Sequence, residues 1–207
     1  MKISVGLFGF GKTGAIVAQE IIKDEMCELK WVMRKSLANE GDYASYLLGF
    51  NHDEGKFYSI ASIDPDTFYI SHEVDVIIDF AAVSAVDYYY QAASQGTRIV
   101  SAISRYDEEH LHKLYELGKK TAVLYSPNIT LGINFLIEAS KVLQIIAPNA
   151  DIEIIEEHFR EKKDVSGTAL RIAEDLGLDK QQHVNSMRVG GIVGKHEVIF
   201  GLPHQTI

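Results

Sequence analysis

The chain has 207 residues, of which 46% are hydrophobic and 24% charged, so it can bury the core of one large or two small domains. Its net charge of −9 argues against a surface that binds nucleic acid. A single cysteine, Cys27, excludes an internal disulfide and a thiolate metal cluster, and we expect no metal cofactor. No run of about 18 apolar residues is present, so we expect a cytoplasmic protein without a membrane partner.

A glycine-rich segment follows the first predicted strand, residues 2–8. Gly9-Phe10-Gly11-Lys12-Thr13-Gly14 has the spacing GxGxxG, and residues 15–23 have helical spacing. The order of strand, glycine loop and helix is typical of dinucleotide binding, because the glycines permit a tight turn and let backbone N–H groups approach a pyrophosphate. Lys12 adds a cation that could contact a phosphate. The alternative is a tight strand-to-helix turn without a ligand.

The second predicted strand, residues 29–33, ends at two cations, Arg34 and Lys35. In this fold an acidic residue about 20 positions past the glycines binds the adenosine ribose, whereas a basic residue accommodates a 2′-phosphate. The sequence therefore predicts that NADPH is the preferred cofactor. NADH remains open, because an arginine can also stack on adenine. The alternative is a pair of solvated cations at a strand end.

Strands and helices alternate through the next part of the chain. Residues 41–71 have mixed signals, with a short helix expected at 43–50 and a turn at 51–55. Residues 74–80 form a nearly continuous apolar run, as in a buried parallel strand. Further elements are expected as helices at 84–95 and 107–119 and strands at 97–102 and 121–125. This alternation predicts an α/β fold with a Rossmann-type doubly wound parallel sheet, the dinucleotide-binding domain, over residues 1–128.

The carboxyl ends of these strands should line the cofactor crevice, because ligands bind at that edge of such sheets. Beside the glycine loop, three segments are therefore candidate cofactor contacts. They are Asp79 and Phe80; Ala102, Ile103 and Ser104; and Ser126, Pro127, Asn128 and Ile129.

The pattern changes after Asn128, and a second domain is predicted over residues 129–207. Its expected elements are a long helix at 129–147, a strand at 151–155, a helix from Ser166 to Gly177, and two alternating runs at 184–190 and 195–201. Strands no longer alternate with helices, which indicates an α+β domain. The chain ends at Ile207 within a strand-like run, and we expect this domain to be incomplete at its C-terminus.

Residues 156–169 carry the polar groups of the second domain. His158 and Lys162 follow a strand, and Ser166 is a natural N-cap for a helix that begins with Gly167 and Thr168. Unpaired backbone N–H groups and the positive end of the helix dipole favour an anion there. The segment predicts a carboxylate or phosphate site with two proton donors beside it. The alternative is a basic surface loop with an ordinary serine cap.

Five segments, in this order, resemble the dihydrodipicolinate reductase (4-hydroxy-tetrahydrodipicolinate reductase) family. They are Gly11-Lys12-Thr13-Gly14; Asp79-Phe80; residues 126–134; Glu156-x-His158-x-x-x-Lys162-x-Asp164-x-Ser166-Gly167-Thr168-Ala169; and residues 188–194 with His196. The resemblance covers essentially the whole chain. It implies an NAD(P)H-dependent reductase of lysine and diaminopimelate biosynthesis that transfers a hydride to a cyclic unsaturated imine dicarboxylate.

The resemblance also implies roles for individual residues. The family's proton-donating histidine and catalytic lysine fall on His158 and Lys162, and its carboxylate-binding Ser-Gly-Thr falls on residues 166–168. A general acid beside a cationic anchor suits hydride delivery to such a substrate. The family's second domain typically assembles tetramers, so the resemblance implies a substrate-binding and oligomerisation domain. The alternating residues 184–201 would suit that contact.

The chain departs from the family pattern around the substrate and the nicotinamide. Phe159 occupies a substrate-contact position where the family has a second histidine, Val165 stands where it has Ala-Pro, residues 102–105 replace Gly-Thr-Thr-Gly, and Phe8 replaces the first loop glycine. Three interpretations stay open: this reductase with a remodelled pocket, a related imine reductase or amino-acid dehydrogenase with a different substrate, and a non-catalytic NAD(P)-binding protein. Retention of the histidine, the lysine and the Ser-Gly-Thr argues against the last.

Overall fold

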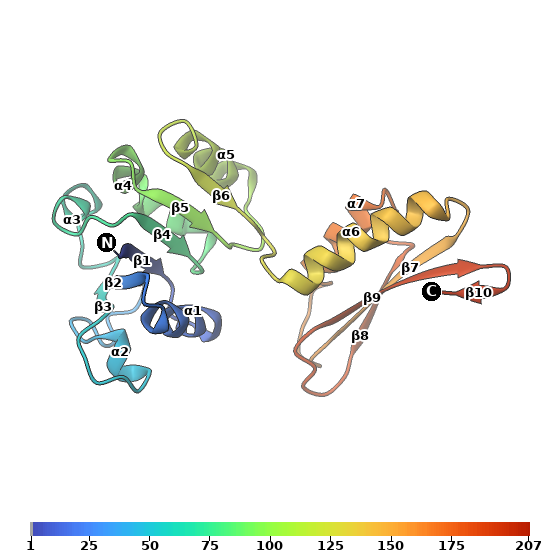
Figure 1. Ribbon diagram of the computed structural model, residues 1–207, viewed down its shortest axis with the longest axis horizontal. Helices are drawn as coiled ribbons and strands as arrows, with labels where there is room; N and C mark the ends of the chain where they lie inside the picture. Colours follow the sequence, from blue (N-terminus) through green and yellow to red (C-terminus); the bar gives the residue numbers. More distant parts are fainter. Residues whose placement is uncertain (1) are drawn as a thin grey trace. The chain divides into compact units, whose positions relative to one another are not determined.

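The computed structural model describes residues 2–207, which form two compact units (Figure 1). The N-terminal unit extends to Pro127 and the C-terminal unit is Asn128–Ile207. Each unit has its own sheet, with helices packed against it. No helix among the described residues is long and apolar enough to cross a membrane.

The N-terminal unit is built on a six-stranded parallel sheet of order β3-β2-β1-β4-β5-β6. Its strands are β1 (Ile3–Phe8), β2 (Cys27–Arg34), β3 (Lys56–Ser59), β4 (Val76–Asp79), β5 (Arg98–Ser101) and β6 (Val123–Tyr125). The strand order reverses between β1 and β4, which is where ligands bind in open sheets of this kind. The predicted doubly wound sheet is confirmed.

Helices cover both faces of this sheet, and each face has its own apolar core (Figure 1). One face carries α1 (Lys12–Lys23) and α2 (Ala44–Leu47), and the other carries α3 (Pro65–Ser71), the 3₁₀ helix η1 (Val83–Tyr88), α4 (Tyr90–Ser94) and α5 (Glu108–Leu117). Because both faces are covered, the central strands are apolar at nearly every position, as the sequence indicated.

Trp31 shows how closely one face is packed. The side chain is 1% exposed, and its Nε1–H donates to the His72 carbonyl at 3.0 Å. The indole lies over Gly6 in the middle of β1, where a Cβ atom would come within 2.2 Å of the ring. Burial of such a side chain contributes a few kcal/mol, and any residue larger than glycine at position 6 would have to displace it.

Three helices of the N-terminal unit differ from the sequence prediction. The helix expected at 84–95 is divided into η1 and α4 at Tyr89, whose buried hydroxyl donates to Asp79. The prediction missed α3, although Asp64 caps its N-terminus and Pro65 lies in its first turn. Helix α1 begins at Lys12, so this lysine belongs to the first helical turn rather than to the loop.

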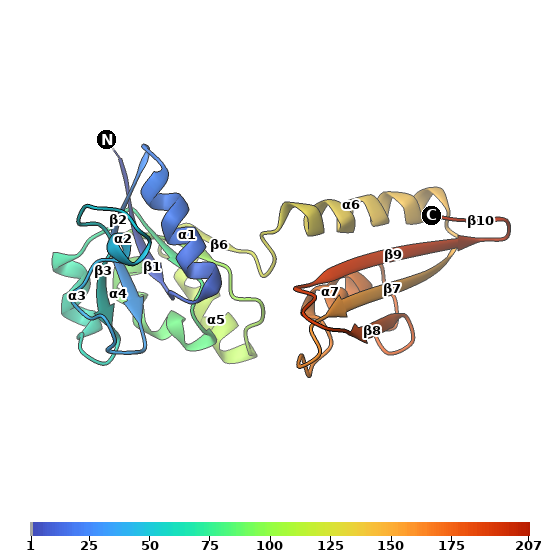
Figure 2. The ribbon, with the colours of Figure 1, turned by 90° about the horizontal axis from the view of Figure 1, so that it is seen from below.

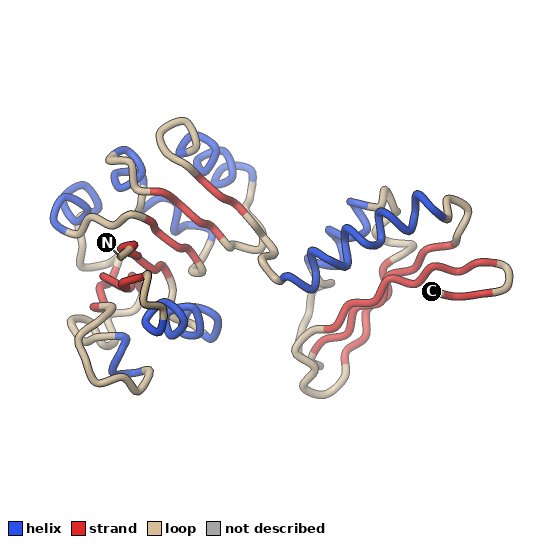
Figure 3. The backbone as a smooth tube through the Cα atoms, in the orientation of Figure 1, coloured by secondary structure: helices blue, strands red, loops and turns tan. Residues whose placement is uncertain are grey.

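The C-terminal unit has a mixed four-stranded sheet of order β10-β9-β7-β8 (Figure 3). The strands are β7 (Asp151–His158), β8 (Val184–Arg188), β9 (Lys195–Leu202) and β10 (Gln205–Thr206), and the helices are α6 (Leu131–Ile146) and α7 (Gly167–Asp175). Strands β8 and β9 are neighbours in sequence, yet they flank β7 on opposite sides, β8 parallel and β9 antiparallel to it. The predicted α+β architecture is confirmed.

Both helices of the C-terminal unit lie on one face of its sheet and leave the other face uncovered within the unit (Figure 2). Alternate residues of β7 face the helices, as the two-residue period of a strand requires. Ile152 and Ile154 enter the core, whereas the next two positions on that face are Glu156 and His158. Strand β7 therefore extends three residues beyond the prediction, and His158 is held by a strand rather than by a loop.

Candidate active site

The glycine segment turns directly from β1 into α1. Gly9 has φ 91°, and a Cβ atom on it would lie 2.8 Å from the Phe80 carbonyl oxygen. A Cβ atom on Gly14 would lie 2.3 Å from the Gly9 carbonyl oxygen, whereas one on Gly11 would meet no atom within 4 Å. The turn and the packing of α1 thus require the first and third glycines, while Gly11 leaves open space at the helix N-terminus.

This open helix start fits the pyrophosphate of a dinucleotide. The first hydrogen bond of α1 joins the Ala15 N–H to the Gly11 carbonyl at 2.9 Å, so the N–H groups of residues 12–14 have no acceptor within the helix. Lys12 and Thr13 are exposed on this first turn. Backbone donors, the helix dipole and a lysine therefore meet at one point that favours negative charge.

Arg34 is packed against aromatic rings at the end of β2. Its guanidinium carbon lies 5.2 Å from the centre of the Phe57 ring and 6.0 Å from that of Phe10, and it donates to the Ala38 carbonyl at 3.2 Å. Lys35 is exposed beside it. A guanidinium plane held in this way suits both pairing with a 2′-phosphate and stacking on adenine.

Asp79 is wholly buried at the end of β4, and its side chain does not reach solvent. Its carboxylate accepts hydrogen bonds from the Ala81 N–H at 2.9 Å and the Tyr89 hydroxyl at 3.0 Å. The Tyr106 hydroxyl lies 3.5 Å from that of Tyr89 and 2.8 Å from the Ser101 Oγ. Burial raises the pKa of Asp79, and the hydrogen bonds that its carboxylate accepts lower it only in part, so the net pKa is about 6. The side chain therefore shapes the loop after β4, and the backbone of that loop faces the sheet edge.

The other predicted cofactor residues of the N-terminal unit lie at the same edge of the sheet. The Ala102 N–H donates to the Asp79 carbonyl and the Ser126 N–H to the Ser101 carbonyl, each at 2.9 Å. The loops that follow these adjacent strands therefore begin next to one another. Ser104 and Pro127 are exposed and Phe80 is half-buried, whereas the Ile103 side chain is 7% exposed and packs within the apolar core.

Two predicted cofactor residues belong to the C-terminal unit instead. Asn128 precedes α6, where its side-chain oxygen accepts from the Thr130 N–H at 3.2 Å and its carbonyl accepts from the Asn134 side chain at 3.1 Å. Ile129 is 51% exposed. All the predicted catalytic and substrate-binding residues also lie in this unit.

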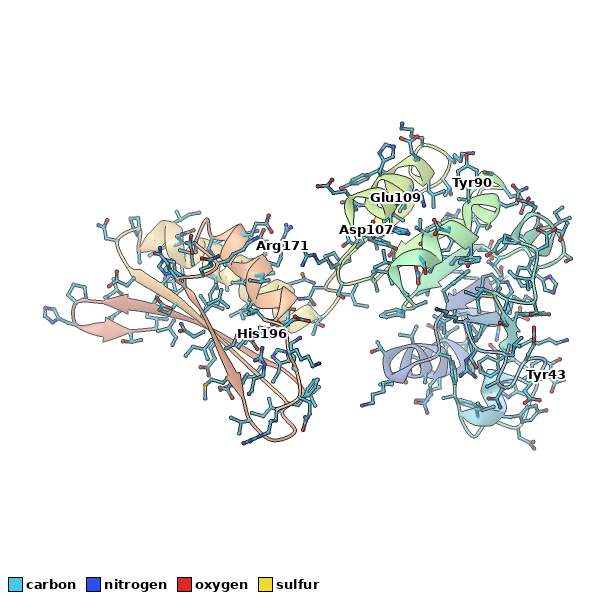
Figure 4. All side chains as sticks on the ribbon, turned by 180° about the vertical axis from the view of Figure 1, so that it is seen from behind. Tyr43, Tyr90, Asp107, Glu109, Arg171 and His196 are labelled. Carbon is cyan, nitrogen blue, oxygen red and sulfur yellow. The ribbon has the colours of Figure 1, made fainter. Side chains whose placement is uncertain are left out.

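The register of the C-terminal sheet brings five polar side chains together. Glu156 of β7 lies opposite Ser186 of β8 and His196 of β9, and His158 lies opposite Arg188. Directly opposed residues point to the same face of a sheet, here the face that carries the helices. Figure 4 shows His196 near the end of the sheet at which β9 begins.

Glu156 is the centre of this cluster and its side chain is wholly buried. One carboxylate oxygen accepts from the Ser166 N–H at 3.1 Å, the Ser186 hydroxyl at 2.6 Å and Arg188 at 2.7 Å. The other accepts from a second Arg188 N–H at 2.9 Å and from His158 Nδ1 at 2.5 Å. Burial alone would raise the pKa of Glu156, but these hydrogen bonds, Arg188 foremost, lower it to about 2. Sequence reasoning assigned Glu156 no role, although an acidic residue two before the histidine was visible.

Arg188 also ties the loop after β7 to the sheet. Its Nε–H donates to the Lys162 carbonyl and a terminal N–H donates to the Asp164 carbonyl, both at 2.9 Å. The loop is thereby held at two backbone positions. The Lys162 ammonium has no hydrogen-bond or ion-pair partner among residues 2–207, so its charge is available to a ligand.

Ser166 occupies the N-cap position of α7, but its side chain does not cap the helix. Its hydroxyl is hydrogen-bonded to His196 Nε2 at 2.7 Å, and its N–H donates to Glu156. The predicted capping role is therefore wrong, because the buried cluster engages the serine more closely than the helix end does. Burial, followed by the nearby charges of His158 and Lys162, lowers the pKa of His196. The sequence offered His196 only as part of a family motif.

Glycines keep space open at two points of the cluster. A Cβ atom on Gly167 would meet no atom within 4 Å, and the N–H groups of the first turn of α7 have no acceptor within the helix. A Cβ atom on Gly194 would lie 3.0 Å from His158 Nε2. Thr168 is half-buried in the first turn, and Phe159 is 40% exposed directly after His158.

The C-terminal cluster can therefore bind an anion and supply a proton. Its one buried carboxylate is fully paired, whereas the Lys162 ammonium and the start of α7 are open to a ligand. Within the described part of the chain, no group of three or more His, Cys, Asp or Glu side chains could hold a metal ion.

Family models match both units of the chain. The model described as "Dihydrodipicolinate reductase, N-terminus" matches residues 3–129, and that described as "Dihydrodipicolinate reductase, C-terminus" matches residues 129–207. The chain belongs to the dihydrodipicolinate reductase family. It is a dihydrodipicolinate reductase-like oxidoreductase whose N-terminal unit is an NAD(P)-binding domain, and the family predicted from the sequence is confirmed.

Two similar proteins are both named 4-hydroxy-tetrahydrodipicolinate reductase. That of Caldanaerobacter subterraneus subsp. tengcongensis is 32% identical over 185 residues, which cover 73% of this chain and 74% of the relative. That of Wigglesworthia glossinidia brevipalpis is 31% identical over 169 residues, 76% of this chain and 64% of the relative. The solved structure of a dipicolinate-bound dihydrodipicolinate reductase from Paenisporosarcina sp. TG-14 shares the fold, with a TM-score of 0.75 and 20% identity over 100% of this chain and 86% of that chain.

Proposed function

We propose that this dihydrodipicolinate reductase family member is an NAD(P)H-dependent 4-hydroxy-tetrahydrodipicolinate reductase of lysine and diaminopimelate biosynthesis. The observation that carries the proposal is that the Glu156–Arg188 pair holds three features together: His158, the loop of the unpaired Lys162 ammonium, and the open start of α7. A cyclic imine with two carboxylates needs a cationic anchor and a proton donor, and this cluster offers both.

In this proposal the N-terminal unit holds the cofactor. The backbone at Gly11 and the Lys12 side chain contact the pyrophosphate, and Arg34 and Lys35 contact the adenosine end. NADPH is preferred to NADH because cations, and no carboxylate, stand at the end of β2. When bound, the reduced nicotinamide supplies the hydride.

The C-terminal unit supplies charge and protons. Lys162 and the backbone N–H groups of Gly167 and Thr168 bind the substrate carboxylates, and His158 Nε2 gives its proton to the substrate, with Lys162 assisting. The 4-hydroxyl leaves as water, and one hydride and one proton add to the resulting conjugated ring, so the net change is a two-electron reduction. His158 is then left neutral, with its remaining proton on Nδ1.

Assembly forms part of the same proposal. The family resemblance favours a homotetramer in the cytoplasm, joined through the C-terminal units. The uncovered face of that sheet carries Ile155 and Ile199 among polar residues such as Glu153, a composition that suits contact with another copy.

Turnover is tested by NADPH oxidation with freshly generated 4-hydroxy-tetrahydrodipicolinate and, in parallel, with a panel of cyclic imines that carry one carboxylate or none. The proposal expects the dicarboxylate to have by far the highest kcat/KM. Faster reduction of a monocarboxylate imine would instead support a second function, that of a related imine reductase. Phe159 is the observation that favours this alternative, because it exposes an apolar ring beside His158.

The anion site is tested separately by calorimetric titration with pyridine-2,6-dicarboxylate. Lys162→Met removes the charge but keeps much of the stem, so the dicarboxylate should bind more weakly, and the variant should show a higher KM and a lower kcat. Lys163→Met is the matched control, because Lys163 is the exposed next residue. Equal binding by wild type and Lys162→Met would place the anion site elsewhere.

A further inference from the structure

We propose that Glu156 is a positioning residue of the candidate active site. Its carboxylate keeps the His158 ring in the tautomer that carries the proton on Nδ1, so that Nε2 faces the bound substrate. The inference rests on the proposed role of His158 as proton donor, and it names the residue through which that role is set.

The two nitrogens of the His158 ring have different surroundings. Nδ1 lies 2.5 Å from a Glu156 carboxylate oxygen, and an ionised carboxylate only accepts hydrogen bonds, so Nδ1 must carry a proton. Nε2 has no hydrogen-bond partner among residues 2–207, and it faces Gly194, whose missing side chain leaves the adjacent space open. Only Nε2 is therefore available to exchange a proton with a ligand.

Glu156 is itself too firmly held to release the ring. Besides His158, its two oxygens accept four hydrogen bonds, from Arg188 twice, from the Ser186 hydroxyl and from the Ser166 N–H. Glu156 and His158 are two residues apart on β7, so the strand presents both to the same face. The orientation of the imidazole is thus fixed by a strand, a neighbouring strand and the start of α7.

Stability alone does not account for this arrangement. A buried ion pair such as Glu156 with Arg188 adds little net stability compared with apolar residues of similar size. The preceding inward positions of β7 are Ile152 and Ile154, so this face of the strand otherwise holds apolar side chains. The pair instead connects His158 to the loop of Lys162, whose carbonyl accepts from Arg188. Through Arg188, one buried carboxylate thereby ties the His158 ring to the backbone of the loop that carries Lys162.

Glu156→Gln breaks the arrangement with little change in shape. The glutamine amide N–H₂ can donate to Nδ1, which would move the single proton of the neutral ring to Nε2. A neutral ring of that tautomer is a much weaker acid than an imidazolium whose Nδ1–H is held by a carboxylate. In serine proteases, replacing the aspartate that orients the catalytic histidine by asparagine has the same effect on the tautomer and lowers kcat by about four orders of magnitude.

The first measurement is long-range ¹H–¹⁵N NMR on ¹⁵N-histidine-labelled protein, at a pH at which the His158 ring is neutral. The His158 signal is assigned by its absence from His158→Ala. Wild type should show the Nδ1–H tautomer and Glu156→Gln a shift toward Nε2–H. Glu157→Gln, on the next residue of β7 and the opposite face, should match wild type. An Nε2–H tautomer in wild type would overturn the inference, and this arm needs no variant of Glu156 to fold.

The second measurement is a double-mutant cycle on kcat. Glu156→Gln should lower kcat by roughly two to four orders of magnitude in wild type, but by less than about threefold when His158 is already alanine. Equal losses in both backgrounds would show a merely structural role and overturn the inference. If wild type itself does not reduce the dicarboxylate, the proposed function fails, while the NMR result still decides whether Glu156 sets the tautomer.

Discussion

Asp79 in the N-terminal unit and Glu156 in the C-terminal unit are both fully buried, and both stand near the carboxyl end of a central strand. Their pKa values shift in opposite directions. Asp79 is bonded only to neutral donors, and burial raises its pKa to about 6, whereas Arg188 leads the donors that lower the pKa of Glu156 to about 2. Two carboxylates that are both buried thus have opposite pKa shifts, because one has a cationic partner and the other does not.

The comparison separates two uses of a buried acid. The Asp79 carboxylate holds the Ala81 backbone and so shapes the loop at the cofactor edge of its sheet. The Glu156 carboxylate stays ionised and orients His158 and Arg188. In the proposed function the N-terminal unit binds the cofactor and the C-terminal unit binds the substrate, so variants in the two units should affect different steps.

The largest effect is expected from His158→Ala, which removes the proposed proton donor of the C-terminal unit. We expect kcat to fall by roughly two to four orders of magnitude, with NADPH affinity unchanged, because the proposed cofactor contacts lie on other elements. Steady-state kinetics and fluorescence titration of NADPH measure the two quantities. His204→Ala, at an exposed position, is the control. Turnover within a few-fold of wild type would reduce His158 to a structural residue.

The next effect concerns stability against pH and tests the two carboxylates directly. The pKa of Asp79 is higher in the folded state than its ordinary value of 3.8, so its stabilisation is complete below about pH 4 and is lost as pH rises through about 6. The pKa of Glu156 is lower in the folded state than its ordinary value of 4.5, so its contribution is present above that value and is lost as pH falls toward 2.

For the buried Asp79, the raised pKa corresponds to roughly 3 kcal/mol of unfolding free energy between the two ends of that pH range. Urea unfolding at a series of pH values should therefore show a flatter profile between pH 4 and 6 for Asp79→Asn, and a flatter profile below pH 4.5 for Glu156→Gln. If both variants flatten the same pH range, the contrast between the two carboxylates is wrong.

A smaller effect is expected at the cofactor edge of the N-terminal unit. Replacing Arg34 and Lys35 together by alanine should weaken NADPH binding by about 1 to 3 kcal/mol, since charge-assisted hydrogen bonds to the 2′-phosphate are lost, and should weaken NADH binding less. Calorimetric titration of both cofactors measures the difference. A Lys23→Ala, Lys30→Ala double variant removes two cations of the same unit as the control. Equal weakening of both cofactors would contradict the predicted preference for NADPH.

The smallest effect is expected from Thr168→Val in the first turn of α7. It deletes one hydroxyl but leaves the backbone N–H groups, so binding of pyridine-2,6-dicarboxylate should weaken by about 1 kcal/mol. Thr206→Val, at an exposed position of the same unit, should bind the dicarboxylate as wild type does. A loss as large as that of Lys162→Met would mean that the hydroxyl, rather than the helix start, is the main anion contact.

Local signals were sufficient to predict much of the N-terminal unit. The strand, glycine loop and helix at 2–23 and the apolar runs at 74–80 and 97–102 follow from periodicity and from the conformational needs of glycine. The sequence did not predict the helix break at Tyr89, because the buried hydrogen bond between Tyr89 and Asp79 at that point joins residues ten positions apart. The aromatic packing of Arg34 on Phe57 was likewise invisible, since the partners lie on different strands.

The sequence by itself determined the alternating order of elements, the glycine turn, the change to an α+β pattern after Asn128 and the family motif around His158. Only the tertiary structure decided that Glu156 is the hub of the cluster and that Ser166 contacts His196 instead of capping α7. The physical reason is that periodicity and capping depend on neighbours in sequence, whereas the cluster depends on register. Strands β8 and β9 reach Glu156 from opposite sides of β7, and which residues face each other there is fixed by pairing across about 30 to 40 positions of chain.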